Sequence, residues 1–299
     1  MQTNLYTHKD ANIRKTWLLM TLAGVLVIGF GFLMSQVYQD PFILYGFVAF
    51  SIVSNIVAYW KSDAIALSLS GAQKLERAGN ERLFRIVENL VITAGLPMPR
   101  LYVIPGSQIN AFATGRNPEH SAVAVTEGAL ATLDDNELTG VLAHELSHIG
   151  NRDMLVSTVV VVLAGIISIA SDWMMRMSMF GGSDRDNRNA GPITVVLMVA
   201  AAILAPLAAT LIQLAVSRKR EYLADASGAL LTRYPEGLAS ALEKISHDHG
   251  SLPGASTATA HLFLANPFGD GSRSRKWLTT LFATHPPVEE RIRILRGMK

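Results

Sequence analysis

The chain of 299 residues contains no cysteine, and only 17% of its residues are charged, with a net charge of +2. The absence of cysteine excludes disulfide bridges and thiolate ligands, so any metal must be held by His, Asp or Glu. Soluble globular proteins have about 25% charged residues, so the low charge favours a membrane protein. The small net charge, with no run of Lys and Arg among aromatic residues, gives no indication of a nucleic-acid partner.

The sequence contains long apolar segments without charged residues. A bilayer core requires about 20 apolar residues, and four segments are close to that length: 17–36, 41–60, 154–171 and 192–216. Buried core helices are one alternative, but these seldom exceed about 14 apolar residues without a charge. A cleaved signal peptide is another, but the first run is too long and a second follows closely. We therefore predict four transmembrane helices in two hairpins.

Basic residues beside the runs indicate orientation, because Lys and Arg concentrate in cytoplasmic loops. The N-terminal tail carries Lys9, Arg14 and Lys15, whereas residues 37–40 carry no basic side chain. Three consecutive basic residues follow the last run at 218–220. Basic and acidic residues are mixed between the third and fourth runs, which leaves that link ambiguous. On balance we expect a multi-pass protein with both termini and both polar regions in the cytoplasm.

The runs divide the chain into four parts. These are an N-terminal tail with the first hairpin (1–61), a first polar block (62–153), the second hairpin (154–216) and a second polar block (217–299). Each polar block is too short to bury a full hydrophobic core alone. We therefore expect the two blocks to form one domain, which the second hairpin splits in sequence.

The first polar block shows a helical pattern followed by strand-like runs. The helical pattern extends from Ser70 to Ala94, where Gly95 and Pro97 should stop it. Short strand-like runs separated by turn residues follow at 101–105, 110–114 and 121–126. The block therefore predicts a small sheet with at least one covering helix.

A second helix of this block begins with a capping pair. Asp134 and Glu137 have the spacing of a reciprocal cap, and we expect the helix to continue without a break into the third apolar run. The second block predicts helices over 217–231 and 235–245, a long loop over 249–276 and a last helix from Pro286.

The capped helix carries the motif "HELSH", with His144, Glu145 and His148. A spacing of four residues places both imidazoles on one helix face, where one zinc ion can take a nitrogen from each. Glu145 lies beside that face and can take the proton of an attacking water. A pair of surface histidines on an ordinary amphipathic helix is the alternative. The motif favours a mainly α integral membrane protein with a zincin-like α+β domain.

A catalytic zinc site needs a third protein ligand and keeps a fourth position for water. Glu221 is well placed on the helix after the fourth run, although beside Arg220 it also fits a surface ion pair. Asp225, one turn later, can accept a hydrogen bond from a ligand imidazole and orient it. Four other histidines occur in loop-like sequence, where solvated side chains are expected: His120, His247, His249 and His261.

These motifs resemble those of the HtpX-type membrane zinc metalloproteases, relatives of the prenyl-protein endopeptidases. The likeness covers almost the whole chain and includes "INAFATG", "AVTEGAL", "HELSH", "REYLADASGA" and "THPPVEERI"; the stretch 250–276 is unmatched. The resemblance implies one Zn²⁺ per chain, held by His144, His148 and Glu221. It also implies that Asp225 is the companion of Glu221 in the family's E-x-x-x-D element.

Three further roles follow from the resemblance alone. His285 would stabilise the oxyanion of the tetrahedral intermediate, unless it caps the last helix. Arg291 would lie near the same cleft, unless it is solvated. Asn110 would begin a strand that lines the substrate groove, unless it is a turn residue and Phe112 belongs to the core.

The implied function is an endopeptidase of misfolded or damaged membrane proteins in the bacterial inner membrane. Its partners would be protein substrates and the lipid bilayer. Both a monomer and a homo-oligomer are compatible with the sequence. One alternative is a non-catalytic membrane scaffold with structural zinc, which Glu145 and an incomplete ligand shell argue against. Another is a narrow processing enzyme for lipidated C-termini, but four spans are few for the large chamber of such relatives.

Overall fold

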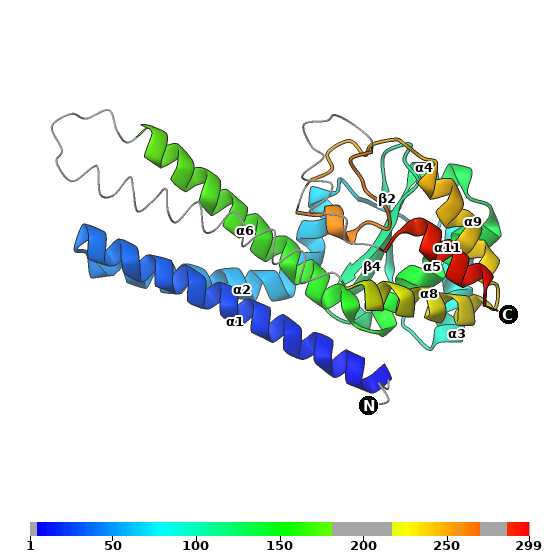
Figure 1. Ribbon diagram of the computed structural model, residues 1–299, viewed down its shortest axis with the longest axis horizontal. Coiled ribbons are helices and arrows are strands. Elements are labelled where there is room, and N and C mark those ends of the chain that lie inside the picture. The colour runs from blue at the N-terminus through cyan, green and yellow to red at the C-terminus, as the bar shows by residue number, and fades with distance from the viewer. Residues whose placement is uncertain (1–4, 181–216, 257, 270–285, 299) are drawn as a thin grey trace.

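The computed structural model describes residues 5–180, 217–256, 258–269 and 286–298. Figure 1 shows a helical arm beside a globular part. The arm consists of α1 (Leu5–Tyr38), α2 (Pro41–Leu69) and α6 (Asp153–Phe180). In the globular part, shorter helices pack on a small sheet. Helix therefore predominates in the described residues, as the sequence predicts.

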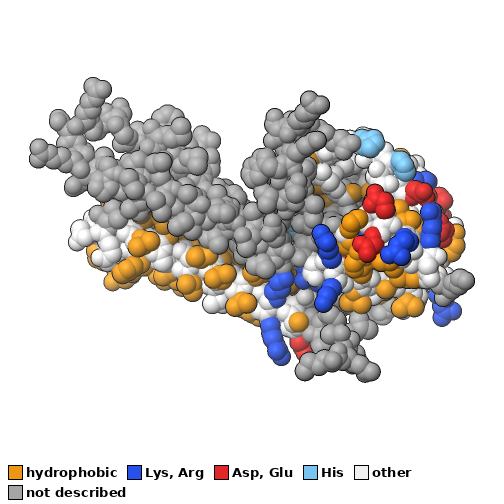
Figure 2. Space-filling model, viewed as in Figure 1, with side chains coloured by type: hydrophobic (Ala, Val, Ile, Leu, Met, Phe, Trp, Pro, Cys, Tyr) orange, Lys and Arg blue, Asp and Glu red, His pale blue; other side chains and the backbone are white. Residues whose placement is uncertain are grey.

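The helical arm has the length and composition of membrane-spanning structure. Among the described residues, Asp10–Gln36 and Pro41–Leu69 are each long and apolar enough to cross a membrane. Large apolar side chains such as Trp17, Leu18 and Phe42 are more than half exposed along α1 and α2. Figure 2 shows apolar side chains along the surface of the arm. Such an extended apolar surface suits contact with lipid.

The third predicted span lies within α6, which packs on the first hairpin. Val156, Val159 and Leu163 of α6 are buried together with Leu19 of α1 and Ala58 of α2. The fourth predicted span, 192–216, lies outside the described residues. The structure therefore supports the first two predicted spans by length and composition, and four transmembrane helices stay a prediction.

The predicted continuous helix from the zinc motif into the third span is wrong. Helix α5 (Asp135–Gly150) ends at the motif, and α6 leaves it at an angle of 83°. Asn151 caps α5 with its backbone N–H, and Arg152 takes a left-handed conformation with φ 57°. This turn lets α5 pack inside the globular part while α6 extends into the arm. If α5 and α6 are counted as one broken span, they make a third candidate membrane crossing among the described residues.

The sheet contains the three predicted strands and one short strand. Its order is β1-β2-β4-β3, from β1 (Gln73–Lys74), β2 (Arg100–Ile104), β3 (Ala111–Gly115) and β4 (Ser121–Thr126). Strands β2 and β4 are parallel, and the other pairs are antiparallel. Strand β3 is therefore at one edge of the sheet.

The helix predicted from Ser70 to Ala94 is present only in its second half. Gly71 and Gly79 adopt positive φ values of 65° and 81°, which helical residues do not use, and β1 lies between them. Helix α3 (Glu81–Ala94) follows and ends at Gly95 in the predicted left-handed cap.

Alternate residues of the strands face two different layers. In β4, Val123 and Val125 belong to the main core with α3 and α5. Ala122 and Ala124 face a second cluster that includes Phe263 and residues of α2 and α6. The sheet thus separates α5, the helix of the metal motif, from the end of α2 and from α6.

Helices from both polar blocks share the main core. Helices α8 (Arg218–Thr232) and α9 (Pro235–Ser246) pack on α5, and α11 (Val288–Arg296) packs on α9. Helices α8 and α9 end within one residue of the predicted positions, and α9 and α11 begin within two residues of them. Leu142 of the first block is buried with Leu238 and Leu295 of the second, which supports one domain split in sequence.

Candidate metal centre

Helix α5 is fixed at its start, and it presents the motif histidines on one face. The Asp134 side chain accepts from the N–H groups of Asn136 and Glu137, and Glu137 accepts from the Asp134 N–H. This reciprocal cap satisfies backbone donors that would otherwise lack partners. The predicted capping box is thus present, and ten residues after Asp134 the side chain of His144 lies almost fully buried.

Helix α8 lies against α5 at a glycine. A Cβ atom at Gly228 would stand 3.0 Å from the His144 backbone nitrogen, so the small residue permits the close contact between the helices. Glu221 and Asp225 precede Gly228 at helical spacing and lie on the same face. Close packing therefore delivers two carboxylates of the second polar block to the histidines of the first.

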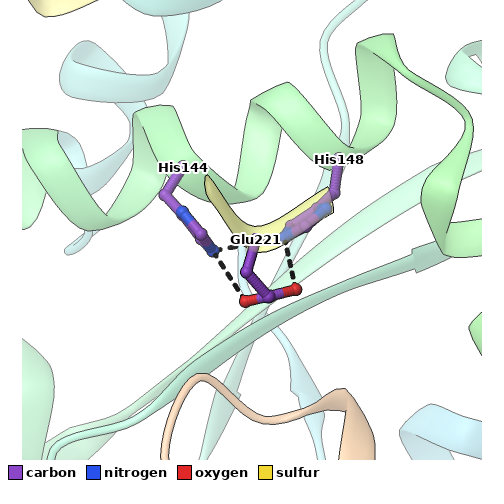
Figure 3. A group of neighbouring side chains, drawn as sticks. All are labelled: His144, His148 and Glu221. Atoms are coloured by element: carbon purple, nitrogen blue, oxygen red, sulfur yellow. Dashed lines mark hydrogen bonds and ion pairs between the residues drawn. The ribbon is translucent and has the colours of Figure 1, made fainter. Parts of the chain in front are cut away.

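His144, His148 and Glu221 converge on one point (Figure 3). The two Nε2 atoms are 3.2 Å apart. Glu221 Oε1 lies 3.6 Å from His148 Nε2, and Oε2 lies 3.8 Å from His144 Nε2. Ligand atoms at about 2.05 Å from a tetrahedral zinc lie roughly 3.3 Å apart. The observed separations fit a zinc ion with small adjustments.

Asp225 lies behind His144, as predicted. Its Oδ1 atom is 2.9 Å from His144 Nδ1, which leaves Nε2 to face the metal position. Arg291 grips the same carboxylate, with Nε to Oδ2 at 2.8 Å and Nη2 to Oδ1 at 2.7 Å. Burial would raise the pKa of Asp225, but the hydrogen bonds from Arg291 and His144 lower it to about 2. Asp225 therefore remains ionised beside the ligand.

Asp153 has the corresponding place behind His148, and sequence reasoning missed it. Its Oδ2 atom is 3.2 Å from His148 Nδ1. Burial lowers the pKa of His148, but the Asp153 hydrogen bond and the charges of Glu221, Asp153 and Glu145 raise it to about 9 in the metal-free protein. The only signal in the sequence is an acidic residue five positions after His148. Each histidine ligand thus has its own carboxylate.

Glu145 lines the small cavity at the ligands and is almost fully buried. The cavity of about 40 Å³ is also bounded by Ala113 of the edge strand and Arg220 of α8. A volume of this size holds only a few water molecules. It has room for an attacking water beside the carboxylate, whereas a peptide requires the surrounding residues to move.

The segment 260–265 covers this cavity, contrary to the prediction that His261 is solvated. The short 3₁₀ helix η2 (Ala260–Leu262) buries His261, whose Nε2 lies 3.1 Å from the Ser157 carbonyl oxygen of α6. Leu262 and Leu264 line the same cavity. Because the surrounding sequence is rich in Gly, Ser and Pro, it gave no sign that this histidine packs against the metal motif. The other three loop histidines, His120, His247 and His249, are exposed.

Asn110 holds the covering segment. Its side-chain amide donates to the Ala265 carbonyl at 2.9 Å, and its Oδ1 accepts from the Ala265 N–H at 3.1 Å. Leu264 donates its own N–H to the Ala111 carbonyl at 3.0 Å. The side chain of Asn110, the predicted groove residue, therefore bonds to the protein's own backbone. Phe112 belongs to the core, as in the alternative interpretation.

Of the two remaining predicted site residues, the structure describes Arg291 only. Arg291 is only 2% exposed, so the solvated alternative is wrong, and its guanidinium reaches the metal centre through Asp225. Burial lowers the pKa of Arg291, but the hydrogen bond and charge of Asp225 raise it above its ordinary value. His285 lies outside the described residues.

Comparison with known proteins identifies the family of the chain. Residues 77–299 match the model of peptidase family M48. A "Protease HtpX homolog" of Tropheryma whipplei (strain Twist) is 43% identical over 98% of each chain. One from Syntrophobacter fumaroxidans (strain DSM 10017 / MPOB) is 49% identical over 83% of this chain and 87% of its own.

A solved structure shows a similar fold at lower identity. The crystal structure of Ste24p from S. mikatae superposes with a TM-score of 0.51 and 21% identity, over 97% of this chain and 67% of that one. The resemblance inferred from the sequence motifs is thereby confirmed. The family match and relatives aligned along almost the full length show that the chain belongs to peptidase family M48 and is a metalloprotease of the HtpX type.

Proposed function

We propose that the chain is a membrane-anchored endopeptidase with one zinc ion, which cleaves misfolded or damaged membrane proteins at the cytoplasmic surface of the bacterial inner membrane. The observation that carries the proposal is the meeting of His144, His148 and Glu221 with the buried carboxylate of Glu145 in one cavity. Three protein ligands leave a fourth position for water or substrate, which is the composition of a catalytic site.

The chemistry divides between the metal and the chain. A zinc ion at this position would supply Lewis acidity, which polarises a carbonyl and makes water acidic near neutral pH. Glu145 takes the proton of the attacking water and delivers it to the leaving amine. Asp225 and Asp153 hold the two imidazoles so that their Nε2 atoms face the metal position.

An extended peptide has a backbone partner in the edge strand β3. Along an antiparallel strand, the backbone N–H and C=O groups of one residue point toward the partner strand, and those of the next residue point away from it. The Ala111 carbonyl faces away from β4, because it accepts from Leu264, and Ala113, two residues later, faces the same way. Ala113 lines the metal cavity, and within the described residues no partner outside the sheet takes its backbone N–H or C=O, so these groups can pair with a substrate strand at the reacting centre.

The proposed substrate class follows from the position of the centre relative to the arm. Helix α6 begins at Asp153, which contacts His148 directly, so the arm starts at the metal centre itself. Substrate segments leaving a bilayer would arrive at a similar depth. The basic residues in the first turns of α1 and at the start of α8 support a cytoplasmic position.

The proposal is tested with Glu145→Gln, which removes the proton acceptor and leaves the ligands in place. We expect the purified variant to retain zinc and to lose casein cleavage and cleavage of a denatured membrane protein by at least about 100-fold. Glu119→Gln, at an exposed glutamate away from the cavity, is the matched control and should keep full activity.

The same assay separates the alternatives. A scaffold with structural zinc would give no cleavage in the wild type either. A narrow processing enzyme would cleave a lipidated peptide but leave casein intact. Full casein cleavage by Glu145→Gln would contradict the proposed role of Glu145.

A further inference from the structure

Asp153 is the point where the metal centre and the membrane arm meet. Its carboxylate is only 4% exposed and has partners on both sides. Oδ2 lies 3.2 Å from His148 Nδ1, and Oδ1 accepts from Asn12 Nδ2 at 2.6 Å. Arg220 Nε is 3.6 Å from Oδ1. One side chain thus joins a metal ligand on α5, the first helix of the arm and the start of α8.

Asn12 also holds the bend between α5 and α6. Its amide donates to the Asn151 carbonyl at 3.3 Å as well as to Asp153, and these two acceptors flank the left-handed Arg152. Asn12 is 7% exposed, and α1 lies alongside α6 (Figure 1). The buried amide therefore fixes both the turn and the carboxylate that the turn presents.

The two histidine ligands differ in what supports them. Asp225 behind His144 is bound by Arg291, so among the described residues its support comes from α8 and α11 of the globular part. Asp153 behind His148 takes its shortest hydrogen bond from α1, which is 141 residues away in sequence. A ligand imidazole keeps its orientation and tautomer only while the partner on its other nitrogen is held.

We infer that Asp153 and Asn12 are positioning residues for His148, so that the first membrane helix is part of the support of the metal centre. This inference rests on the proposed zinc site and adds a determinant outside the metal motifs. Displacing α1 from the bend loosens Asp153, turns the His148 ring and weakens metal binding without altering any ligand. Zinc affinity therefore depends on how the membrane hairpin is seated.

The experiment measures zinc affinity of the full chain in detergent by competition with a chelator. We expect Asp153→Asn to bind zinc about 10- to 100-fold more weakly, the usual effect of removing such a partner. Asn12→Leu and Asn12→Ala, which remove the amide at similar or smaller volume, should each bind roughly fivefold more weakly, as the loss of one hydrogen bond predicts. The control is Thr16→Val on the same helix, because the buried Thr16 hydroxyl donates to the Asn12 carbonyl of its own helix and, within the described part of the chain, to no other group. The zinc affinity of this variant should not change.

A second readout separates positioning from general stability. Cobalt replaces zinc in such sites, and its visible absorption reports the geometry of the ligands. We expect the spectrum to shift in the Asp153 and Asn12 variants and to stay as in the wild type in Thr16→Val, even if all variants unfold at lower temperature.

The outcomes are distinguishable. A wild type that binds no zinc refutes the proposed function, and the inference with it. A wild type that binds zinc, with unchanged affinity and cobalt spectrum in folded Asp153→Asn and in either folded Asn12 variant, overturns the inference and leaves the proposed function standing. If Asn12→Leu does not fold, Asn12→Ala and Asp153→Asn decide the result.

Discussion

Arg291 and Asp225 form a buried bidentate ion pair, with hydrogen bonds of 2.8 and 2.7 Å and both side chains only 2% exposed. The pair stands directly behind His144, and it joins the last helix, α11, to α8. A buried pair of this kind constrains both partners, because removing one leaves an uncompensated charge, at a cost of about 3–5 kcal/mol.

Arg291→Met should therefore destabilise the metal-free protein in a pH-dependent way. The folded pKa of Asp225 is about 2, below its ordinary value of 3.8. A depressed pKa contributes stability that is present above about pH 4 and is lost as the pH falls through about 2. The melting temperature of the variant should thus lie well below that of the wild type near pH 7, and the gap should narrow near pH 3.

The control for this change is Arg293→Met, at an exposed arginine on the same helix. Its melting temperature should follow the wild type at every pH. An equal gap for Arg291→Met at both pH values would show that the Asp225 charge is not what the arginine stabilises.

Gly228→Ala should disturb the metal centre through the backbone. The new Cβ would lie 3.0 Å from the His144 nitrogen, and overpacking of this kind costs about 1–3 kcal/mol. We expect lower thermal stability and lower zinc content, because α8 must move with Glu221. Gly165→Ala on α6, where nothing lies within 4 Å, should change neither property; zinc retention in Gly228→Ala would show that the helices tolerate the shift.

Asn110→Ala should release the segment that covers the metal cavity. The lost hydrogen bonds to the Ala265 backbone are worth about 1–3 kcal/mol, so the Leu264 amide should exchange with solvent deuterium roughly tenfold faster. Asn117→Ala is the control, because Asn117 caps a turn beyond the other end of β3. Unchanged exchange at Leu264 together with a raised KM for casein would instead place Asn110 in direct contact with substrate.

The absence of cysteine makes the predicted orientation directly measurable. A single cysteine at Gln39, exposed between α1 and α2, should react with a membrane-impermeant maleimide added to intact cells. A cysteine at Glu119, exposed on the globular part, should react only after the inner membrane is broken. The reverse pattern would place the globular part outside the cytoplasm.

Local patterns were sufficient for much of the fold and for the ligands. The capping pair Asp134 and Glu137, and the left-handed Gly95, act within one or two turns of chain, so their effect is readable from sequence. His144 and His148 share a helix face by spacing alone. Glu221 was identified through its position after a predicted span and through the family motif.

The remaining features depend on contacts that no local pattern encodes. The bend at Arg152 is held by Asn12, a residue of another helix, so the apolar run after the motif reads as a continuation of α5. His261 is buried because a polar, Gly-rich loop folds over the cavity. The bend between α5 and α6 brings Asp153 next to His148, and no local sequence pattern predicts this bend.

The zinc site is tested most directly by metal analysis of the detergent-purified wild type and of Glu221→Gln. We expect about one zinc ion per wild-type chain, with casein cleavage that a chelator abolishes and added zinc restores. Glu221→Gln should lose most of the zinc and the cleavage together. A wild type that cleaves casein without zinc, or a Glu221→Gln variant with full zinc and full activity, would contradict the proposed zinc site.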